Sequence, residues 1–130
     1  MLLGCSGQHD TTQKSADSWR LGYGLTETST VVCSTVPGDV WLGSSGPLLP
    51  GIEAKLVDSE GNEITEYNKP GELWVKGPAV VLGYLHNDKA TQETFVEAGN
   101  GRYMRTGDEA IVAKGPKGHE HLFIVDRIKE

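Results

Sequence analysis

The chain has 130 residues, with 12 Lys and Arg against 18 Asp and Glu, so its net charge is −6. This length is enough for one modest domain with a single core. The acidic balance argues against nucleic acid as the main partner, because duplex binding relies on clustered Lys and Arg.

The sequence shows neither a membrane span nor a secretory signal. No stretch approaches the ~18 consecutive apolar residues that cross a bilayer, and the start at Met1 lacks the basic residues of a signal peptide. Cys5 and Cys33 are the only cysteines, and their spacing fits no CxxC pattern. Two thiols do not make the disulfide framework of a secreted protein, so we predict a reducing, cytoplasmic location.

The first patterned feature is Tyr23-Gly24-Leu25-Thr26-Glu27, after a polar stretch over residues 1–18 that we expect to be a disordered lead-in. These five residues combine an aromatic ring, a hydroxyl and a carboxylate. An aromatic face can stack on a planar base, a hydroxyl can bond a phosphate oxygen, and a carboxylate can hold Mg²⁺. The alternative is a glycine turn before a short helix over 26–32, with Thr26 as its cap and Glu27 in its first turn.

Residues 37–51 are predicted to form an irregular surface loop, because they hold three prolines and four glycines. The stretch Gly43-Ser44-Ser45-Gly46 is similar to the serine elbow of hydrolases, but that motif requires glycine where Pro47 stands. The four histidines are scattered, and His119-Glu120-His121 is too closely spaced for a zinc motif of the HExxH type. We therefore expect neither a Ser-His-Asp arrangement nor a zinc site.

From residue 53 the hydrophobic period becomes two, which is the period of strands. Strands are predicted over 53–57, 72–76, 109–113 and 121–125, and the last two flank a hairpin turn at 114–118. One short helix is predicted over 87–95, with Asp88 as its cap. These short strands, separated by turns, indicate a mainly β structure, mostly antiparallel, with short helices.

Two more polar clusters follow in the second half of the chain. In Tyr103-Met104-Arg105-Thr106-Gly107-Asp108, Gly107 permits a tight turn that presents Asp108. The carboxylate of Asp108 can accept both hydroxyls of a ribose. The last cluster is Asp126-Arg127-Ile128-Lys129. Their plain alternatives are a turn aspartate between two strands and a solvated, charged terminus.

With three such clusters in this order, the sequence resembles the adenylate-forming (AMP-binding) superfamily, and within it the 4-coumarate–CoA ligase-like acyl-CoA ligases. Residues 23–27 match the family's aromatic-Gly-x-Thr-Glu motif, and residues 71–78 match its G-E-L-x-x-x-G-P block. Residues 103–108 match its Y-x-R-T-G-D block, and residues 126–129 match the opening of its D-R-x-K hinge motif. The resemblance covers about residues 20 to 130.

The resemblance implies a nucleotide site. Tyr23 would stack on the adenine, and Thr26 would contact the α-phosphate of ATP or of the acyl-adenylate. Glu27 would hold Mg²⁺. Asp108 would bind the ribose hydroxyls, and Arg127 would support the same ribose.

Three further assignments come from the same resemblance. Gly22 and Gly24 would line the acyl pocket with backbone, and the loop around Gly46 and Gly51 would lie near it. Lys129 would sit at the hinge about which a C-terminal lid domain swings. The implied reaction activates a small carboxylic acid with ATP to an acyl-adenylate, which then forms a thioester with coenzyme A.

The implied fold is a distorted antiparallel β-barrel subdomain of a larger α/β adenylate-forming domain. Residues 19–125 would form the C-terminal part of the AMP-binding N-terminal domain, and residues 126–130 would begin the hinge. A non-catalytic remnant and a small β interaction module are the alternatives. The resemblance leaves the acid open among aromatic, medium-chain and polyketide-derived acids, and it adds the peroxisome as the alternative location for a full-length parent.

Two parts of the family pattern are absent from these 130 residues: the Ser/Thr/Gly-rich phosphate loop that ends in lysine, and the C-terminal lid with its own lysine. Groups that act as a unit lose most of the rate when members are removed. We therefore expect the isolated chain to make no acyl-CoA. Pyrophosphate release with ATP and aromatic or fatty acids measures this, and turnover clearly above the rate without protein would contradict the expectation.

Overall fold

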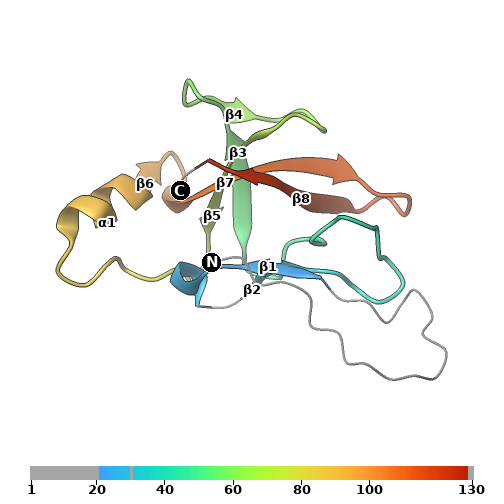
Figure 1. The fold of residues 1–130 in the computed structure, drawn as a ribbon, viewed down its shortest axis with the longest axis horizontal. Helices are drawn as coiled ribbons and strands as arrows, with labels where there is room; N and C mark the ends of the chain where they lie inside the picture. The colour runs from blue at the N-terminus through green and yellow to red at the C-terminus, as the bar shows by residue number, and fades with distance from the viewer. Residues whose placement is uncertain (1–20, 30, 129–130) are drawn as a thin grey trace.

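The computed structural model describes residues 21–29 and 31–128. The predicted lead-in over residues 1–18 and the predicted hinge residue Lys129 lie outside these residues. The described elements are, in order, β1 (Gly22–Gly24), the 3-10 segment η2 (Thr26–Thr28), β2 (Val31–Ser34), β3 (Glu53–Val57), β4 (Glu63–Ile64), β5 (Gly71–Lys76), α1 (Asp88–Thr94), β6 (Phe95–Ala98), β7 (Gly101–Lys114) and β8 (Glu120–Arg127) (Figure 1).

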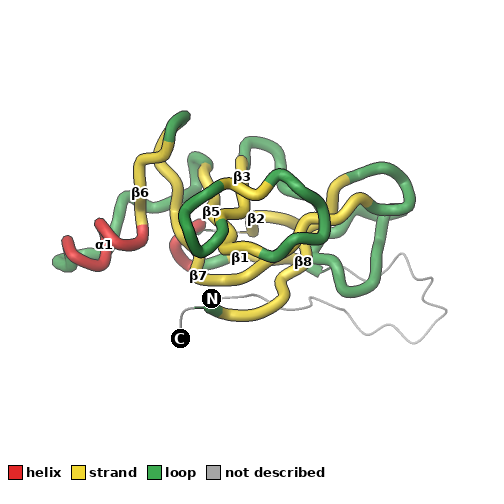
Figure 2. The backbone as a smooth tube through the Cα atoms, turned by 90° about the horizontal axis from the view of Figure 1, so that it is seen from above, coloured by secondary structure: helices red, strands yellow, loops and turns green. Residues whose placement is uncertain are grey.

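Two antiparallel sheets make up the structure. Strands β1 and β2 form a small sheet, and the other six strands form a larger one in the order β4-β3-β5-β7-β6, with β8 also paired to β7. Strand β7 is the centre of the larger sheet, because it pairs with β5, β6 and β8. Helix α1 and β6 lie at one end of the molecule, away from β8 (Figure 2). No helix among the described residues is long and apolar enough to cross a membrane.

The mainly β prediction is confirmed, but the larger sheet does not close into a barrel among the described residues. Strand β4 forms one edge of this sheet, and β6 and β8 form the other. Strand β4 has only two residues, too few to carry the pairing further around. The strand predictions at 53–57 and 72–76 agree with β3 and with all but the first residue of β5.

The core lies between the two sheets. Along β5 buried and partly exposed residues alternate, as expected for a strand with one face on the core. Leu73 and Val75 of this strand belong to the same buried cluster as Tyr23 and Val32 of the small sheet. Burial of such side chains contributes roughly 1.5–3 kcal/mol each, so the small sheet is held against the larger one by shared apolar packing.

The prediction of a tight turn at Gly107 is wrong. Residues 101–114 form the single strand β7, so the Y-x-R-T-G-D block lies inside a strand and joins the region predicted as a separate strand. Gly107 has φ +74°, which is accessible to glycine at little cost. The register with β5 shifts near this point, between Glu72 and Trp74. A bulge therefore kinks the strand without ending it.

Two helix predictions also need correction. The helix expected over 26–32 stops after three residues, and β2 begins at Val31 because β-branched residues favour strands. Thr26 is inside η2, and Leu25 precedes it at the cap position. Helix α1 exists as predicted, but its cap is Asn87, whose side chain accepts a hydrogen bond from the Ala90 amide at 3.1 Å.

A short loop over residues 44–49, which we call the connector, bonds to both sheets. In Figure 1 it belongs to the teal segment between the blue strands of the small sheet and the red strand β8. Four main-chain bonds join it to β8 and β2: Ser45 N to Leu122 O (2.8 Å), Leu122 N to Gly46 O (3.1 Å), Ser34 N to Pro47 O (3.2 Å) and Leu49 N to Val32 O (2.9 Å). The connector therefore fixes β2 relative to β8.

The connector requires glycine at position 46. A Cβ there would lie 2.3 Å from the carbonyl carbon and oxygen of Ser34, and φ is +90°. Gly61 has nearly the same φ, +89°, but a Cβ there would meet no atom within 4 Å. We expect Gly46→Ala to lower the free energy of unfolding by about 3 kcal/mol or more, and Gly61→Ala by about 1 kcal/mol, because only the first adds a backbone clash to the strain of positive φ.

Urea unfolding of the two variants measures this difference. Equal losses in both would show that the contact with β2 does not constrain the connector.

Candidate functional site

Three of the residues singled out in the sequence meet at one point. The hydroxyl of Tyr23 donates a hydrogen bond to Asp108 Oδ2 at 2.5 Å, and Arg127 Nη1 donates to Asp108 Oδ1 at 3.2 Å. Tyr23 comes from β1, Asp108 from the segment of β7 just after its kink, and Arg127 from the end of β8, directly opposite Asp108 in the strand register. Both oxygens of the Asp108 carboxylate thus have donors from different elements.

The Asp108 carboxylate lies in a buried place. Tyr23 is 0% exposed and Asp108 is 3% exposed, whereas about half of the Arg127 side chain is exposed. Burial, followed by the hydrogen bond to Asp108, raises the pKa of Tyr23 well above its usual range. The phenol therefore stays a proton donor to the carboxylate. Of the three side chains in this cluster, only that of Arg127 is substantially exposed.

Thr106 is a residue of this site to which sequence analysis gave no role. Its hydroxyl donates to the carbonyl oxygen of Leu73 at 2.7 Å and accepts from the amide of Asp108 at 3.1 Å. Thr106 thereby ties the kinked part of β7 to β5 and sets the direction of Asp108. Its position two residues before an aspartate was the available signal, since a threonine hydroxyl commonly bonds an amide two residues on.

Glu27 has a separate set of contacts. Tyr84 donates its hydroxyl to Glu27 Oε1 at 3.0 Å, and the amide of Val81 donates to the carbonyl oxygen of Glu27 at 2.8 Å. Glu27 is half-buried and Thr26 is exposed. Burial, with the hydrogen bond to Glu27 as a further cause, raises the pKa of Tyr84. The loop before α1 therefore orients the carboxylate that was predicted to bind Mg²⁺.

The two glycines predicted for the acyl pocket lie on β1, next to Tyr23. A Cβ at Gly22 would come within 3.3 Å of Val31 Cγ1 and 3.4 Å of the carbonyl oxygen of Cys33, so this glycine lets β1 lie close to β2. Gly24 is buried in the same strand. These contacts give Gly22 a packing role, and the role of both glycines toward an acyl group stays a prediction.

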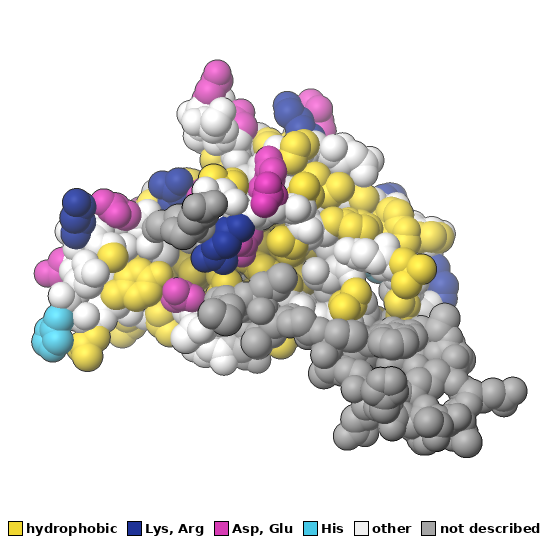
Figure 3. Space-filling view, viewed as in Figure 1, with side chains coloured by type: hydrophobic (Ala, Val, Ile, Leu, Met, Phe, Trp, Pro, Cys, Tyr) yellow, Lys and Arg dark blue, Asp and Glu magenta, His cyan; other side chains and the backbone are white. Residues whose placement is uncertain are grey.

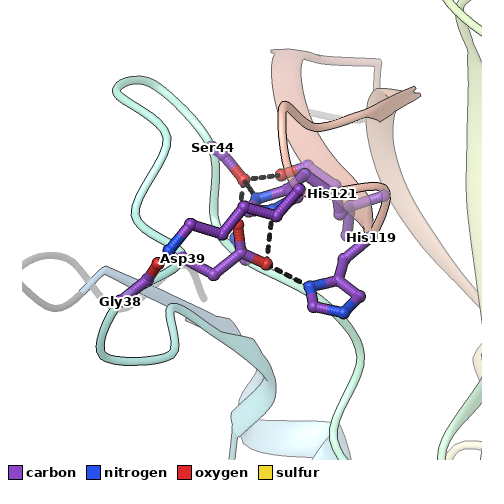
Figure 4. Close-up of polar contacts among 8 residues, drawn as sticks. Gly38, Asp39, Ser44, His119 and His121 are labelled. Atoms are coloured by element: carbon purple, nitrogen blue, oxygen red, sulfur yellow. Dashed lines mark hydrogen bonds and ion pairs between the residues drawn. The ribbon is translucent and has the colours of Figure 1, made fainter.

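A second polar cluster brings together a serine, two histidines and an aspartate (Figure 4). Ser44 Oγ lies 2.8 Å from His121 Nδ1, and His121 Nε2 lies 3.3 Å from Asp39 Oδ2. His119 Nδ1 is 2.6 Å from the same oxygen. The expectation of no Ser-His-Asp arrangement is therefore wrong. Ser44 and His121 are 77 positions apart in sequence, so no local motif could predict this contact.

The chemistry of this cluster differs from that of a hydrolase. Ser44 and His121 are both 0% exposed, and Ser44 Oγ already accepts the amide of Gly46 at 2.8 Å. A nucleophile must reach the carbonyl that it attacks, and the Ser44 hydroxyl is closed off from solvent.

No group of three metal-ligating side chains suited to a metal ion occurs among the residues that the structure describes. The hydrogen bond from His119, the largest cause, lowers the pKa of Asp39, so the carboxylate stays charged.

A cavity of about 1140 Å³ lies beside this second cluster. Residues 36–39, β4 and the turn between β7 and β8 contribute to its lining, which does not include Tyr23, Asp108 or Arg127. Hydrophobic side chains gather on the right-hand part of the face in Figure 3, while basic and acidic ones are interspersed across it. The candidate site at Asp108 is therefore distinct from this cavity.

The comparisons with known proteins agree with the sequence resemblance. The model of the AMP-binding enzyme family matches residues 12–85. The acyl-CoA ligase AKT1 of Alternaria alternata is 51% identical over 109 residues, which are 83% of this chain and 19% of that protein. The acyl-CoA ligase lcsD of Purpureocillium lilacinum is 47% identical over 84% of this chain and 28% of its own length. This chain thus spans between 19% and 28% of the length of these two relatives.

Solved structures give the same result. The anthranilate CoA ligase AuaEII, in complex with anthranoyl-AMP, has a TM-score of 0.71 and 31% identity over 83% of this chain and 19% of that one. The O-succinylbenzoate coenzyme A synthetase of Bacillus subtilis, in complex with AMP, has a TM-score of 0.66 and 30% identity over 83% of this chain and 21% of its own.

The buried thiol beside Tyr23 generates a pH prediction. Cys33 lies opposite Tyr23 in the register of β1 and β2 and is 0% exposed. Burial raises the pKa of Cys33 to about 12. The thiol ionises near pH 9 in the unfolded chain but stays protonated at that pH in the folded chain. The contribution of the protonated thiol to the free energy of unfolding is therefore fully present below pH 9 and is lost as the pH rises toward about 12.

We expect the wild-type chain to lose about 1.5 kcal/mol of stability through this thiol between pH 8 and pH 10, and Cys33→Ala to lose that much less over the same interval. Urea unfolding at several pH values measures the slope. Val32→Ala is the matched control, because Val32 is also 0% exposed but does not titrate. Parallel slopes for wild type and Cys33→Ala would show that the folded thiol titrates normally.

Proposed function

Because this chain belongs to the AMP-binding enzyme family, we propose that it supplies the ribose-binding part of an AMP-forming acyl-CoA ligase. The observation that carries the proposal is the convergence of Tyr23, Asp108 and Arg127 from three strands on one carboxylate. Two of the similar solved structures hold an adenylate, one anthranoyl-AMP and the other AMP. We propose a cytoplasmic location, because the two cysteines of the sequence do not make the disulfide framework of a secreted protein.

Asp108 is the residue that would receive the ribose. Its two oxygens can accept the two hydroxyls in place of, or together with, the hydrogen bonds from Tyr23 and Arg127. Arg127 is half exposed, whereas Tyr23 is buried and keeps the carboxylate fixed. Since the ring of Tyr23 is fully covered here, stacking on the adenine would require its cover to open.

Glu27 and Thr26 would serve the phosphate end of the ligand. A hard oxygen ligand such as the Glu27 carboxylate suits Mg²⁺, which proteins commonly hold with one or two carboxylates plus substrate phosphates. Only one carboxylate oxygen of Glu27 bonds to Tyr84, so the residue fits this role. The metal, when bound, would neutralise phosphate charge. The exposed hydroxyl of Thr26 would donate to the α-phosphate.

The proposed reaction has two steps. A carboxylate oxygen of the acid forms a bond to the α-phosphorus of ATP, the bond to the bridging oxygen breaks, and pyrophosphate leaves. The sulfur of coenzyme A then bonds to the acyl carbon, AMP leaves with the electron pair of the broken acyl–oxygen bond, and the thiol proton passes to solvent. Both steps depend on positioning and on stabilised charge more than on a protein nucleophile.

A titration of the chain with AMP, or with a non-hydrolysable acyl-adenylate analogue, tests the proposal. Calorimetry should show binding to the wild type and at least a tenfold weaker affinity for Asp108→Ala, because the ribose hydroxyls lose their acceptor. Tyr23→Ala should weaken the affinity at least tenfold as well. Tyr23→Phe keeps the buried ring and removes only the hydroxyl, and it replaces the alanine variant if that variant does not fold.

Asp88→Ala and Tyr67→Ala are the matched controls, since Asp88 is an exposed carboxylate of α1 and Tyr67 is an exposed ring away from the site. Both should bind AMP like the wild type. Binding that is indifferent to Asp108 and Tyr23 would favour a β interaction module unrelated to nucleotides. AMP binding that depends on Asp108 and Tyr23, but without turnover, would fit both the proposed ligase part and a non-catalytic remnant.

A further inference from the structure

We infer that the buried hydrogen bond between Ser44 and His121 is a positioning contact: it fixes the connector and thereby sets where Tyr23 lies relative to Asp108. In its consequence for ligand binding, the inference rests on the proposed nucleotide function. Its structural part, the placement of the Tyr23 hydroxyl on the Asp108 carboxylate, stands apart from that function and can be measured without a ligand.

The side-chain oxygen of Ser44 bonds to two groups, one on β8 and one in the connector. Ser44 Oγ lies 2.8 Å from His121 Nδ1 and accepts the amide of Gly46 at 2.8 Å. The same atom therefore attaches the start of the connector to β8 and shapes its turn at Gly46. Ser44 and His121 are both 0% exposed, and Figure 4 shows the serine hydroxyl facing the imidazole ring. A lost partner would leave a buried polar group unsatisfied.

The ring of His121 has little freedom to move. A Cβ at Gly115 would come within 2.9 Å of its Cδ2 atom, and the ring of Trp41 meets it edge-on at a centroid distance of 5.6 Å. Its Nε2 atom has no hydrogen-bond partner among the described residues, although Asp39 Oδ2 lies 3.3 Å away. In the tautomer with its proton on Nε2, Nδ1 accepts from the Ser44 hydroxyl, for which the carbonyl oxygen of Leu122 at 3.4 Å is the more distant acceptor.

A continuous path leads from this contact to the candidate site. On one side, the connector bonds to Leu122 of β8, the strand that ends at Arg127 opposite Asp108. On the other side, it bonds to Val32 and Ser34 of β2, the strand that carries Cys33 opposite Tyr23. The two halves of the site lie on different sheets, and the connector provides main-chain bonds to both. A shift of the connector would therefore displace the Tyr23 hydroxyl from Asp108.

The test uses the whole chain with ¹³Cζ-labelled tyrosine. The Tyr23 resonance, assigned with Tyr23→Phe, reports the hydrogen bond to Asp108 in the folded protein, and AMP affinity is measured on the same samples. We expect Ser44→Ala to move the Tyr23 resonance toward the value of free tyrosine and to weaken AMP binding about tenfold. Ser45→Ala is the matched control one residue away, since its main-chain bond to Leu122 remains, and it should change neither readout.

A second pair of variants tests the histidine. The amide of Asn can take the place of Nδ1, so His121→Asn should keep more of the Tyr23 signal and of the AMP affinity than His121→Ala. If Ser44→Ala does not fold, Ser44→Cys, which is close in size and a weaker acceptor, is measured with the same criterion.

The outcomes separate the two claims. If Ser44→Ala only lowers the free energy of unfolding and leaves the Tyr23 resonance of the folded protein unchanged, the contact is merely structural and the inference is overturned. The same holds if His121→Asn behaves like His121→Ala. If the wild type binds no AMP, the proposed function fails, while the Tyr23 resonance still decides the positioning role.

Discussion

The structure depends on one buried carboxylate, that of Asp108. A charge in such a place is tolerated only when donors surround it, because an unpaired buried charge costs several kcal/mol. Here the donors are Tyr23 from the small sheet and Arg127 from the far end of β8. The need to satisfy Asp108 thus joins three strands that are distant in the chain, and it fixes the two sheets against each other at the point where a ribose would bind.

The same sequence places a serine, a histidine and an aspartate together in a second location, with a different outcome. The groups are those of a hydrolytic triad, yet Ser44 and His121 are sealed from solvent and Ser44 already serves a backbone amide. What separates a reactive site from a structural one here is access rather than residue identity. At Asp108 one donor, Arg127, remains half exposed. The serine of the second cluster has no such exposed partner, since both groups that bond its oxygen, His121 and Gly46, are buried.

Local patterns sufficed for much of the fold. The period of two predicted β3 and nearly all of β5, and it placed the hairpin of β7 and β8. It failed at Gly107, because a bulge continues a strand where glycine usually indicates a turn. The Tyr23–Asp108–Arg127 cluster was foreseen through family motifs, not through spacing. The contact between Ser44 and His121 was missed because only the folded chain brings the two together.

The thiol of Cys33 can report on local opening of the small sheet. It lies beside Tyr23 on the neighbouring strand and is 0% exposed, so an alkylating reagent can meet it only after the packing around the small sheet opens. Its modification rate would then count local openings rather than intrinsic reactivity. Such an opening would also uncover the ring of Tyr23, so the modification rate would report how often that ring becomes accessible without global unfolding.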